Sequence, residues 1–99
     1  MNLPIRLLPE AKAEFDASAD WYEQQCRGLG VDFVARIREV FKRLAVNPKL
    51  YAIVYRDVRQ AIVTRFPFVV LYREVPGELL VISVFHTAQD PSLWQARAK

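Results

Sequence analysis

The chain has 99 residues, of which 53% are hydrophobic and 25% are charged, and its formal net charge is +3. This size and composition suit one globular domain, residues 1–99, and exclude a disordered chain. No apolar run approaches the ~20 residues that a membrane span needs, so no membrane contact is expected. Cys26 is the only cysteine, which excludes an internal disulfide, and the N-terminus lacks a signal-peptide pattern, so we expect a cytoplasmic protein.

The first part of the chain predicts a short edge strand and a long helix. Leu3, Ile5 and Leu7 alternate with the residues between them, and the proline at position 4 is tolerated at a sheet edge. A helix is expected over residues 9–27, because its leading proline suits the first helical position. Its apolar residues recur at helical spacing, and Cys26 is expected in the core with them: Ala11, Phe15, Ser18, Ala19, Tyr22 and Cys26.

A second helix is expected after the segment Gly28–Gly30, because glycine commonly ends a helix. Asn47–Pro48 ends the second helix, since proline cannot continue it. The short connection makes the two helices an antiparallel αα-hairpin, and the charged outer face of the second helix should be solvated. Its apolar stripe should pack on a sheet: Phe33, Ile37, Val40, Phe41 and Leu44.

Three consecutive antiparallel strands are predicted at residues 58–66, 68–75 and 78–86. These runs are rich in β-branched and aromatic residues, and Pro67 and the turn sequence Pro76–Gly77 separate them. The last run is almost wholly apolar, which predicts a central strand with both faces at least partly covered.

The segments on either side of these strands are less regular. Residues 49–57 form a loop or contain a weak extra strand at 52–55. After residue 86 we expect a loop and one helical turn, with Trp94 docked on the body of the domain. The last five residues should fray, as chain ends often do.

The order strand, helix, helix, strand, strand, strand predicts an α+β fold, in which the αα-hairpin covers one face of a four-stranded antiparallel sheet. The second face would keep apolar residues of the last strand, because side chains alternate between faces. By this alternation Leu80, Ile82 and Val84 share one face, and the other face holds Leu79, Val81 and Phe85. An exposed apolar surface of this kind predicts a binding face for a partner.

Seven short motifs, in this order, resemble those of RelE/ParE-type toxins of type II toxin–antitoxin systems. Each motif is weak alone, and their order and spacing over residues 5–94 carry the resemblance. They are Pro9–Ala11, Asp20–Glu23, Gly28–Gly30, Asn47–Pro48, Arg65–Phe68, Tyr72–Arg73 and His86–Pro91.

The resemblance implies a cognate antitoxin as partner, a toxin–antitoxin hetero-oligomer and no cofactor. One branch of the superfamily, the ParE-like toxins, acts by binding DNA gyrase. Another cleaves mRNA on the ribosome, and a third alternative is a degenerate member that only binds an antitoxin. The acidic first helix with its Trp21–Tyr22 pair and the Arg65–Phe68 segment are closer to the ParE-like branch.

Under the nuclease alternative the catalytic residues would be His86, Arg73 and Arg65, because RNA cleavage needs groups that activate a 2′-hydroxyl and stabilise a developing phosphorane. Gln89 stands where relatives often carry arginine, and this missing cation weakens the alternative. Otherwise His86 is a strand-end histidine that hydrogen-bonds the backbone of the following loop. No metal-ligand spacing or glycine-rich phosphate loop is present in the sequence, so neither a metal nor a cofactor is expected.

Under the binding alternative, Arg59, Arg65, Arg73 and Trp21 are the candidate partner-binding residues. The three arginines have odd residue numbers, so the alternation of side chains along strands could place them on one face. Such a face would suit an acidic, amphipathic antitoxin segment. Whether residues of different strands share a face depends on the strand register, which the sequence does not give. The alternative is that these arginines are solvated charges at a sheet edge. For Trp21, partner contact and packing at the sheet edge both remain open.

Overall fold

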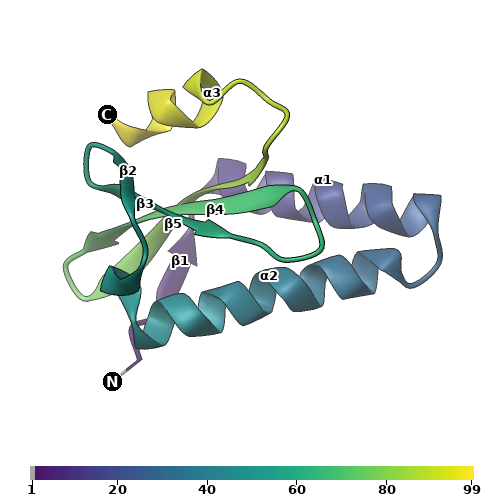
Figure 1. The fold of residues 1–99 in the computed structure, drawn as a ribbon, viewed down its shortest axis with the longest axis horizontal. Coiled ribbons are helices and arrows are strands. Elements are labelled where there is room, and N and C mark those ends of the chain that lie inside the picture. Colours follow the sequence, from purple (N-terminus) through teal and green to yellow (C-terminus); the bar gives the residue numbers. More distant parts are fainter. Residues whose placement is uncertain (1) are drawn as a thin grey trace.

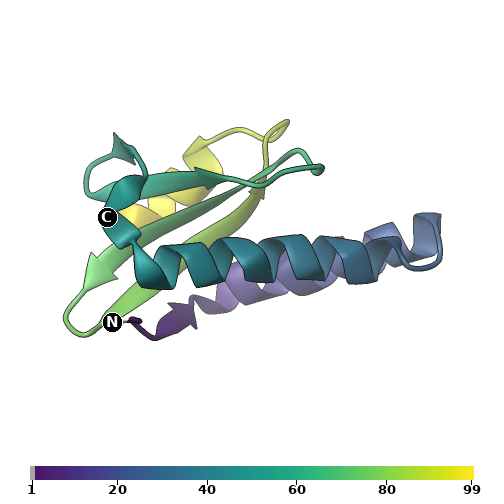
Figure 2. The same ribbon diagram turned by 60° about the horizontal axis from the view of Figure 1, so that its bottom comes forward.

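Two layers make up the structure, a computed structural model that describes residues 2–99: a pair of long helices lies on one face of a five-stranded sheet (Figures 1 and 2). The predicted α+β class and the αα-hairpin on the sheet are therefore confirmed. The elements in chain order are β1 Ile5–Leu7, α1 Pro9–Gln25, α2 Leu29–Val46, the 3₁₀ turn η1 Pro48–Leu50, β2 Ile53–Tyr55, β3 Val58–Ile62, β4 Phe68–Val75, β5 Glu78–His86, α3 Ser92–Gln95 and the 3₁₀ turn η2 Ala96–Ala98.

The strand order is β1-β5-β4-β3-β2, which makes β1 an edge strand and β5 an interior one, as predicted. The sheet has five strands instead of four, because Ile53–Tyr55 pairs with β3 and forms the other edge. The pairing is antiparallel except at β1, which runs parallel to β5 with Ile5 opposite Leu79. The expectation of a purely antiparallel sheet is therefore wrong at this one edge.

Strand β3 ends at Ile62, four residues earlier than predicted, and residues 63–67 form a turn. Arg65 has a φ of 73°, which a strand does not allow, and Pro67 has no N–H for a ladder. The Val63 N–H donates to the Phe68 carbonyl at 3.0 Å and closes the turn. Arg65 therefore projects from a turn and lies outside the face of the strand.

The tip of the helix pair depends on its glycines and on one carboxylate. A Cβ on Gly30 would lie 2.5 Å from the Ala19 carbonyl oxygen, so the close approach of α2 to α1 requires glycine there. Glu23 accepts hydrogen bonds from the N–H groups of Gly28 at 2.8 Å and Gly30 at 3.0 Å. Helix α1 ends at Gln25 and Cys26 is exposed, so the expectation of a core cysteine is wrong, because the chain is already extended at that residue.

The helix pair buries its apolar stripe against the sheet, as predicted. Phe33 is fully buried, with its ring centroid 4.8 Å from that of Phe68 and 5.2 Å from that of Tyr22. Phe41 is only half-buried, at the rim of this layer. The core of the helix face also includes Ile37, Val40, Leu44, Val63, Val70, Tyr72, Leu79, Val81 and Val84.

A β-bulge in β5 changes which residues face which side of the sheet. Leu71 lies opposite Ser83 and Tyr72 opposite Val81, which leaves Ile82 as an extra residue. After the bulge the alternation is inverted, so Val84 packs with the helices while Ile82 and Phe85 face the other side. The predicted grouping of Leu80, Ile82 and Val84 on one face is therefore wrong, because period-2 alternation fails at a bulge.

The second face of the sheet is partly covered by the chain's own C-terminal segment, α3 with η2, which crosses it in Figure 1. Trp94 docks there as predicted, but Ala98 is buried as well, so the expectation of a fraying end is wrong. The buried cluster on this face is Val58, Val69, Leu71, Ile82, Phe85, Trp94 and Ala98. Much of the surface expected to need a partner is therefore already covered.

Candidate functional site

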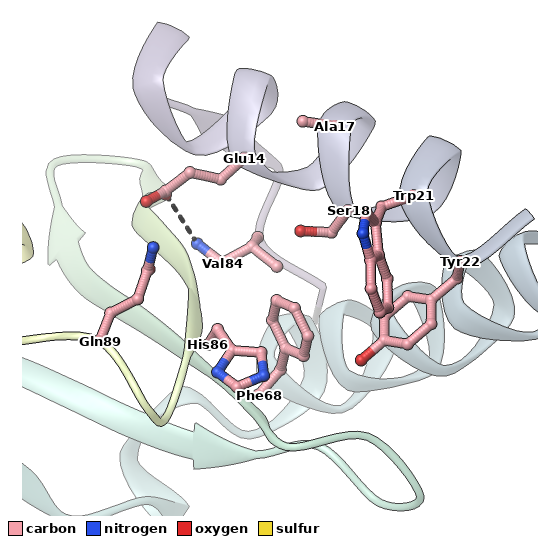
Figure 3. Close-up of a pocket in the computed structure, with 9 residues that line it drawn as sticks. All are labelled: Glu14, Ala17, Ser18, Trp21, Tyr22, Phe68, Val84, His86 and Gln89. Carbon is pink, nitrogen blue, oxygen red and sulfur yellow. Dashed lines mark hydrogen bonds between the residues drawn. The ribbon is translucent and has the colours of Figure 1, made fainter. Parts of the chain in front are cut away.

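A groove of about 500 Å³ lies between α1 and the last part of β5 (Figure 3). It exists because β1 is only three residues long and pairs with residues 79–81 of β5. Beyond that point, among residues 2–99, no strand pairs with the outer edge of β5. The groove is mostly apolar, and its lining residues are Glu14, Ala17, Ser18, Trp21, Tyr22, Phe68, Val84, His86 and Gln89.

One end of the groove is closed by a bidentate ion pair between Glu14 of α1 and Arg97 of the C-terminal segment. The two nitrogen–oxygen distances are 2.9 and 3.1 Å. Arg97 also donates to the Ile82 carbonyl at 3.2 Å, and Glu14 accepts from the Ser83 hydroxyl at 2.8 Å and from the Val84 N–H at 3.3 Å. The pair therefore satisfies two backbone groups of the open β5 edge and joins α1 to the C-terminal segment.

The opposite end of the groove is aromatic. Trp21 is 57% exposed and packs edge-to-face on Tyr22 at 5.1 Å, and both rings are seen together in Figure 3. Tyr22 in turn contacts Phe66 and Phe68. Burial raises the pKa of Tyr22, so its hydroxyl stays protonated and can donate a hydrogen bond. Such a wall suits a partner with apolar side chains and a few hydrogen-bond acceptors.

His86 lies on the floor of the groove, with its ring centroid 5.1 Å from that of Phe68. Its Nδ1 accepts a hydrogen bond from the Ala88 N–H at 3.0 Å, so in the neutral ring the proton is on Nε2. Gln89 donates its backbone N–H to the His86 carbonyl at 3.1 Å. This is the loop-bonded histidine that the sequence offered as the alternative to a catalytic one.

The candidate catalytic set of His86, Arg73 and Arg65 is not assembled. Arg73 lies opposite Leu80, and it is five residues along β4 from Phe68, the partner of His86, which is roughly 17 Å in a strand. Arg73 donates to Asp57 Oδ1 at 2.6 and 3.0 Å and to the Ala98 carbonyl at 2.7 Å. Its guanidinium therefore fixes the C-terminal segment, apart from His86.

The predicted joint arginine face is also wrong, because the register separates its members. Arg59 lies opposite Tyr72, on the helix side, and donates to the Tyr51 carbonyl at 2.6 Å. Arg73, one residue further, points to the other side of the sheet. Arg59 and Arg65 form no ion pair within residues 2–99, and Arg65 is exposed in its turn. Trp21 is the predicted partner-binding residue that the groove contains.

Sequence reasoning missed Glu14 and Arg97. Glu14 sits within the apolar stripe of α1, next to Phe15, where a carboxylate would be half-buried, and this position was an available signal. Arg97 carried no such signal, because its segment was expected to fray.

Among residues 2–99, no cluster of His, Cys, Asp and Glu could hold a metal ion, and no helix is long and apolar enough to cross a membrane.

The family model described as "ParE toxin of type II toxin-antitoxin system, parDE" matches residues 5–91, so this chain belongs to the ParE toxin family of type II toxin–antitoxin systems. A solved structure titled "Chromosomal ParDE TA system from P. aeruginosa" shares its fold, with a TM-score of 0.72 at 22% identity over 85% of this chain and 95% of that chain. No curated protein matches the chain.

Proposed function

We propose that this toxin stops growth by binding DNA gyrase, without chemistry of its own, and that its cognate antitoxin neutralises it by docking in the α1–β5 groove. Family membership supports the toxin–antitoxin pair. The observation that carries the binding mechanism is the preformed apolar and aromatic groove along an open strand edge. The structure of the groove suits recognition of a protein segment.

The groove favours an extended antitoxin segment that adds to β5. Glu14 and Arg97 occupy the Val84 N–H and the Ile82 carbonyl, so such a strand would pair with β5 beyond Val84, where no other strand of residues 2–99 pairs with this edge. Trp21 and Tyr22 provide an apolar wall for its alternate side chains. Helix α1 carries five acidic residues and one lysine, a formal charge of −4. Of these acidic residues only Glu14 lines the groove, where Arg97 pairs with it, so the wall favours apolar side chains, in contrast to the acidic segment expected from the arginines alone.

A binding mechanism is favoured over RNA cleavage by what the basic residues do. Arg73 is held by Asp57 and by the Ala98 carbonyl, and the Nδ1 of His86 is engaged by the following loop. Gln89 adds no cation beside the histidine. A nuclease would need several of these groups free and near one phosphate.

The test is a pair of assays on the purified chain: DNA supercoiling by gyrase, and mRNA integrity in a translation extract. We expect inhibition of supercoiling and intact mRNA, and we expect the His86→Gln variant to behave as the wild type does. Cleavage of ribosome-bound mRNA that is lost in His86→Gln, with gyrase unaffected, would replace the proposal with the nuclease alternative. A chain that is inert in both assays but binds antitoxin would be a degenerate member.

A further inference from the structure

A second apolar groove, of about 490 Å³, lies on the opposite face of the sheet, between β3 and the C-terminal segment. We call it the β3 groove and define it by Val54, Gln60, Ile62, Pro67 and Trp94. The C-terminal segment covers β4, β5 and the start of β3 on this face, where Val58 is buried, but leaves the end of β3 at Ile62 open. We propose that the β3 groove binds the toxin's target, through an acidic, apolar-faced segment of that protein.

The exposure of the groove's apolar residues supports a docking surface. Ile62 is 71% exposed between the buried residues Ala61 and Val63, and Val54 is 44% exposed on the edge strand β2. A single exposed apolar side chain is ordinary, but these two share one groove with Pro67 and the edge of Trp94. One face of a sheet normally needs a covering layer, and this part of it has none among residues 2–99.

The charge beside the groove indicates an acidic partner. Arg56 follows the strand that contributes Val54, and Arg65 precedes the Phe66–Pro67 end of the groove. These two arginines are the positive-φ residues other than glycine in the described chain, with φ values of 53° and 73°. Both are exposed and neither forms an ion pair within residues 2–99. Turns with positive φ thus place one cation before β3 and one after it, next to an apolar floor, and the Arg56 guanidinium lies over the Tyr55 ring at 5.3 Å.

Other occupants fit less well. A second copy of the chain would bring the arginines of the two grooves toward each other, and like charges across an interface are unfavourable. A nucleic acid needs a row of phosphate contacts, whereas this floor is apolar and the flanking turns supply one arginine each. The antitoxin is assigned to the α1–β5 groove, which shares only Phe68 with the lining of this one. The target is therefore the occupant that the β3 groove fits.

The identification of the target as gyrase rests on the proposed function, so the experiment measures growth arrest and gyrase inhibition as two separate outputs, with antitoxin binding as a check on the other groove. Ile62→Asp and Arg65→Glu are compared with Val31→Asp, a control at another exposed valine on α2. Each variant is assayed for growth arrest on expression, for gyrase inhibition and for antitoxin binding by calorimetry. Thermal unfolding checks that each variant is folded.

We expect both β3-groove variants to relieve growth arrest and to raise the concentration for half-inhibition of gyrase at least tenfold. Antitoxin affinity should stay within twofold of the wild type, and Val31→Asp should change neither output. If the variants relieve growth arrest but the wild type does not inhibit gyrase, then gyrase is excluded as the target and the groove remains the target-binding surface.

Three results would overturn the inference. The first is growth arrest by both β3-groove variants that is as strong as that of the wild type. The second is loss of antitoxin binding together with toxicity in folded variants, which would indicate one shared surface. The third is a wild-type dimer, or a co-purifying nucleic acid, that is lost in Ile62→Asp, because the occupant would then be a second copy or a nucleic acid.

Discussion

The two faces of the sheet are covered in different ways. On one face, two long helices bury a continuous stripe that includes Phe33, Ile37 and Leu44. On the other, the short segment formed by α3 and η2 covers β4, β5 and the start of β3 at Val58, with Trp94 and Ala98 as its buried residues. The helix face is a closed core, and the outer face is a partial cover with an open groove beside it.

The difference separates stability from binding. The helix face supplies most of the buried apolar surface, so the fold depends on it. The outer face is held by a few polar links, of which Arg97 to Glu14 and Arg73 to the Ala98 carbonyl are the main ones. Where cover is thin, strand edges and apolar residues stay accessible to partners. Both grooves lie at the margins of this cover.

Phe33→Ala should have the largest effect, because it breaks the helix face at its centre. We expect a loss of about 3–5 kcal/mol in the free energy of unfolding, the usual cost of removing a buried phenylalanine. Phe41→Ala is the matched control: it removes the same atoms at a half-buried rim position and should cost distinctly less. Chemical denaturation measures both. Equal losses would contradict the layer arrangement.

Arg97→Ala should loosen the outer face selectively. It leaves the half-buried Glu14 without its cation and the Ile82 carbonyl without a donor, so we expect a loss of about 1–3 kcal/mol. Amide hydrogen exchange should quicken at Ala98 and along the open edge of β5, with no change at Ile37. If Ile37 quickened equally, the two faces would unfold as one unit and the contrast between them would fail.

Trp21→Ala should separate binding from stability at the α1–β5 groove. Trp21 is mostly exposed, so the free energy of unfolding should change by about 0.5 kcal/mol or less. Antitoxin affinity should fall at least tenfold, which is about 1.4 kcal/mol, since exposed aromatic anchors dominate interfaces. Val31→Ala is the control, and calorimetry with the product of the neighbouring gene is the measurement. Unchanged affinity would remove the antitoxin from this groove.

The helix face could be predicted from sequence because its signals are local and repeated. Apolar residues at helical spacing place Phe33, Ile37 and Leu44 on one stripe, and Pro76–Gly77 marks the β4–β5 turn, with Gly77 at a φ of 77°. Each signal needs only a few neighbouring residues. The fold class, the helix pair and the order of the last three strands follow from such signals.

The site could be predicted only in part, because it depends on relations between distant residues. The bulge at Ile82 is a property of the β4–β5 pairing, and strand register sends Arg59 and Arg73 to opposite faces. The contact between Arg97 and Glu14 joins the two ends of the chain. Trp21 lies off the helical stripe, which is a local signal, and it lines the groove, but its contact with a partner stays a prediction.

The smallest expected effect concerns Tyr72, which links the helix face to the turn before β2. Its hydroxyl donates to the Pro48 carbonyl at 2.6 Å, and burial raises its pKa to about 12. In the unfolded chain the same group titrates near its ordinary pKa of about 10. Folding therefore favours the neutral phenol, and this contribution is complete below pH ~10 and is lost as the pH rises from ~10 to ~12.

By pH ~11 this linkage should remove about 1 kcal/mol from the free energy of unfolding. Tyr72→Phe is the matched control: it lacks the titrating group, so its stability should decline less over the same pH interval. Tyr22, whose pKa burial also raises, contributes equally in both proteins and cancels in the difference. Urea denaturation at several pH values from 9 upward measures the two slopes. Parallel pH profiles would mean that Tyr72 is open to water in solution, and the helix face would then be less closed than its packing indicates.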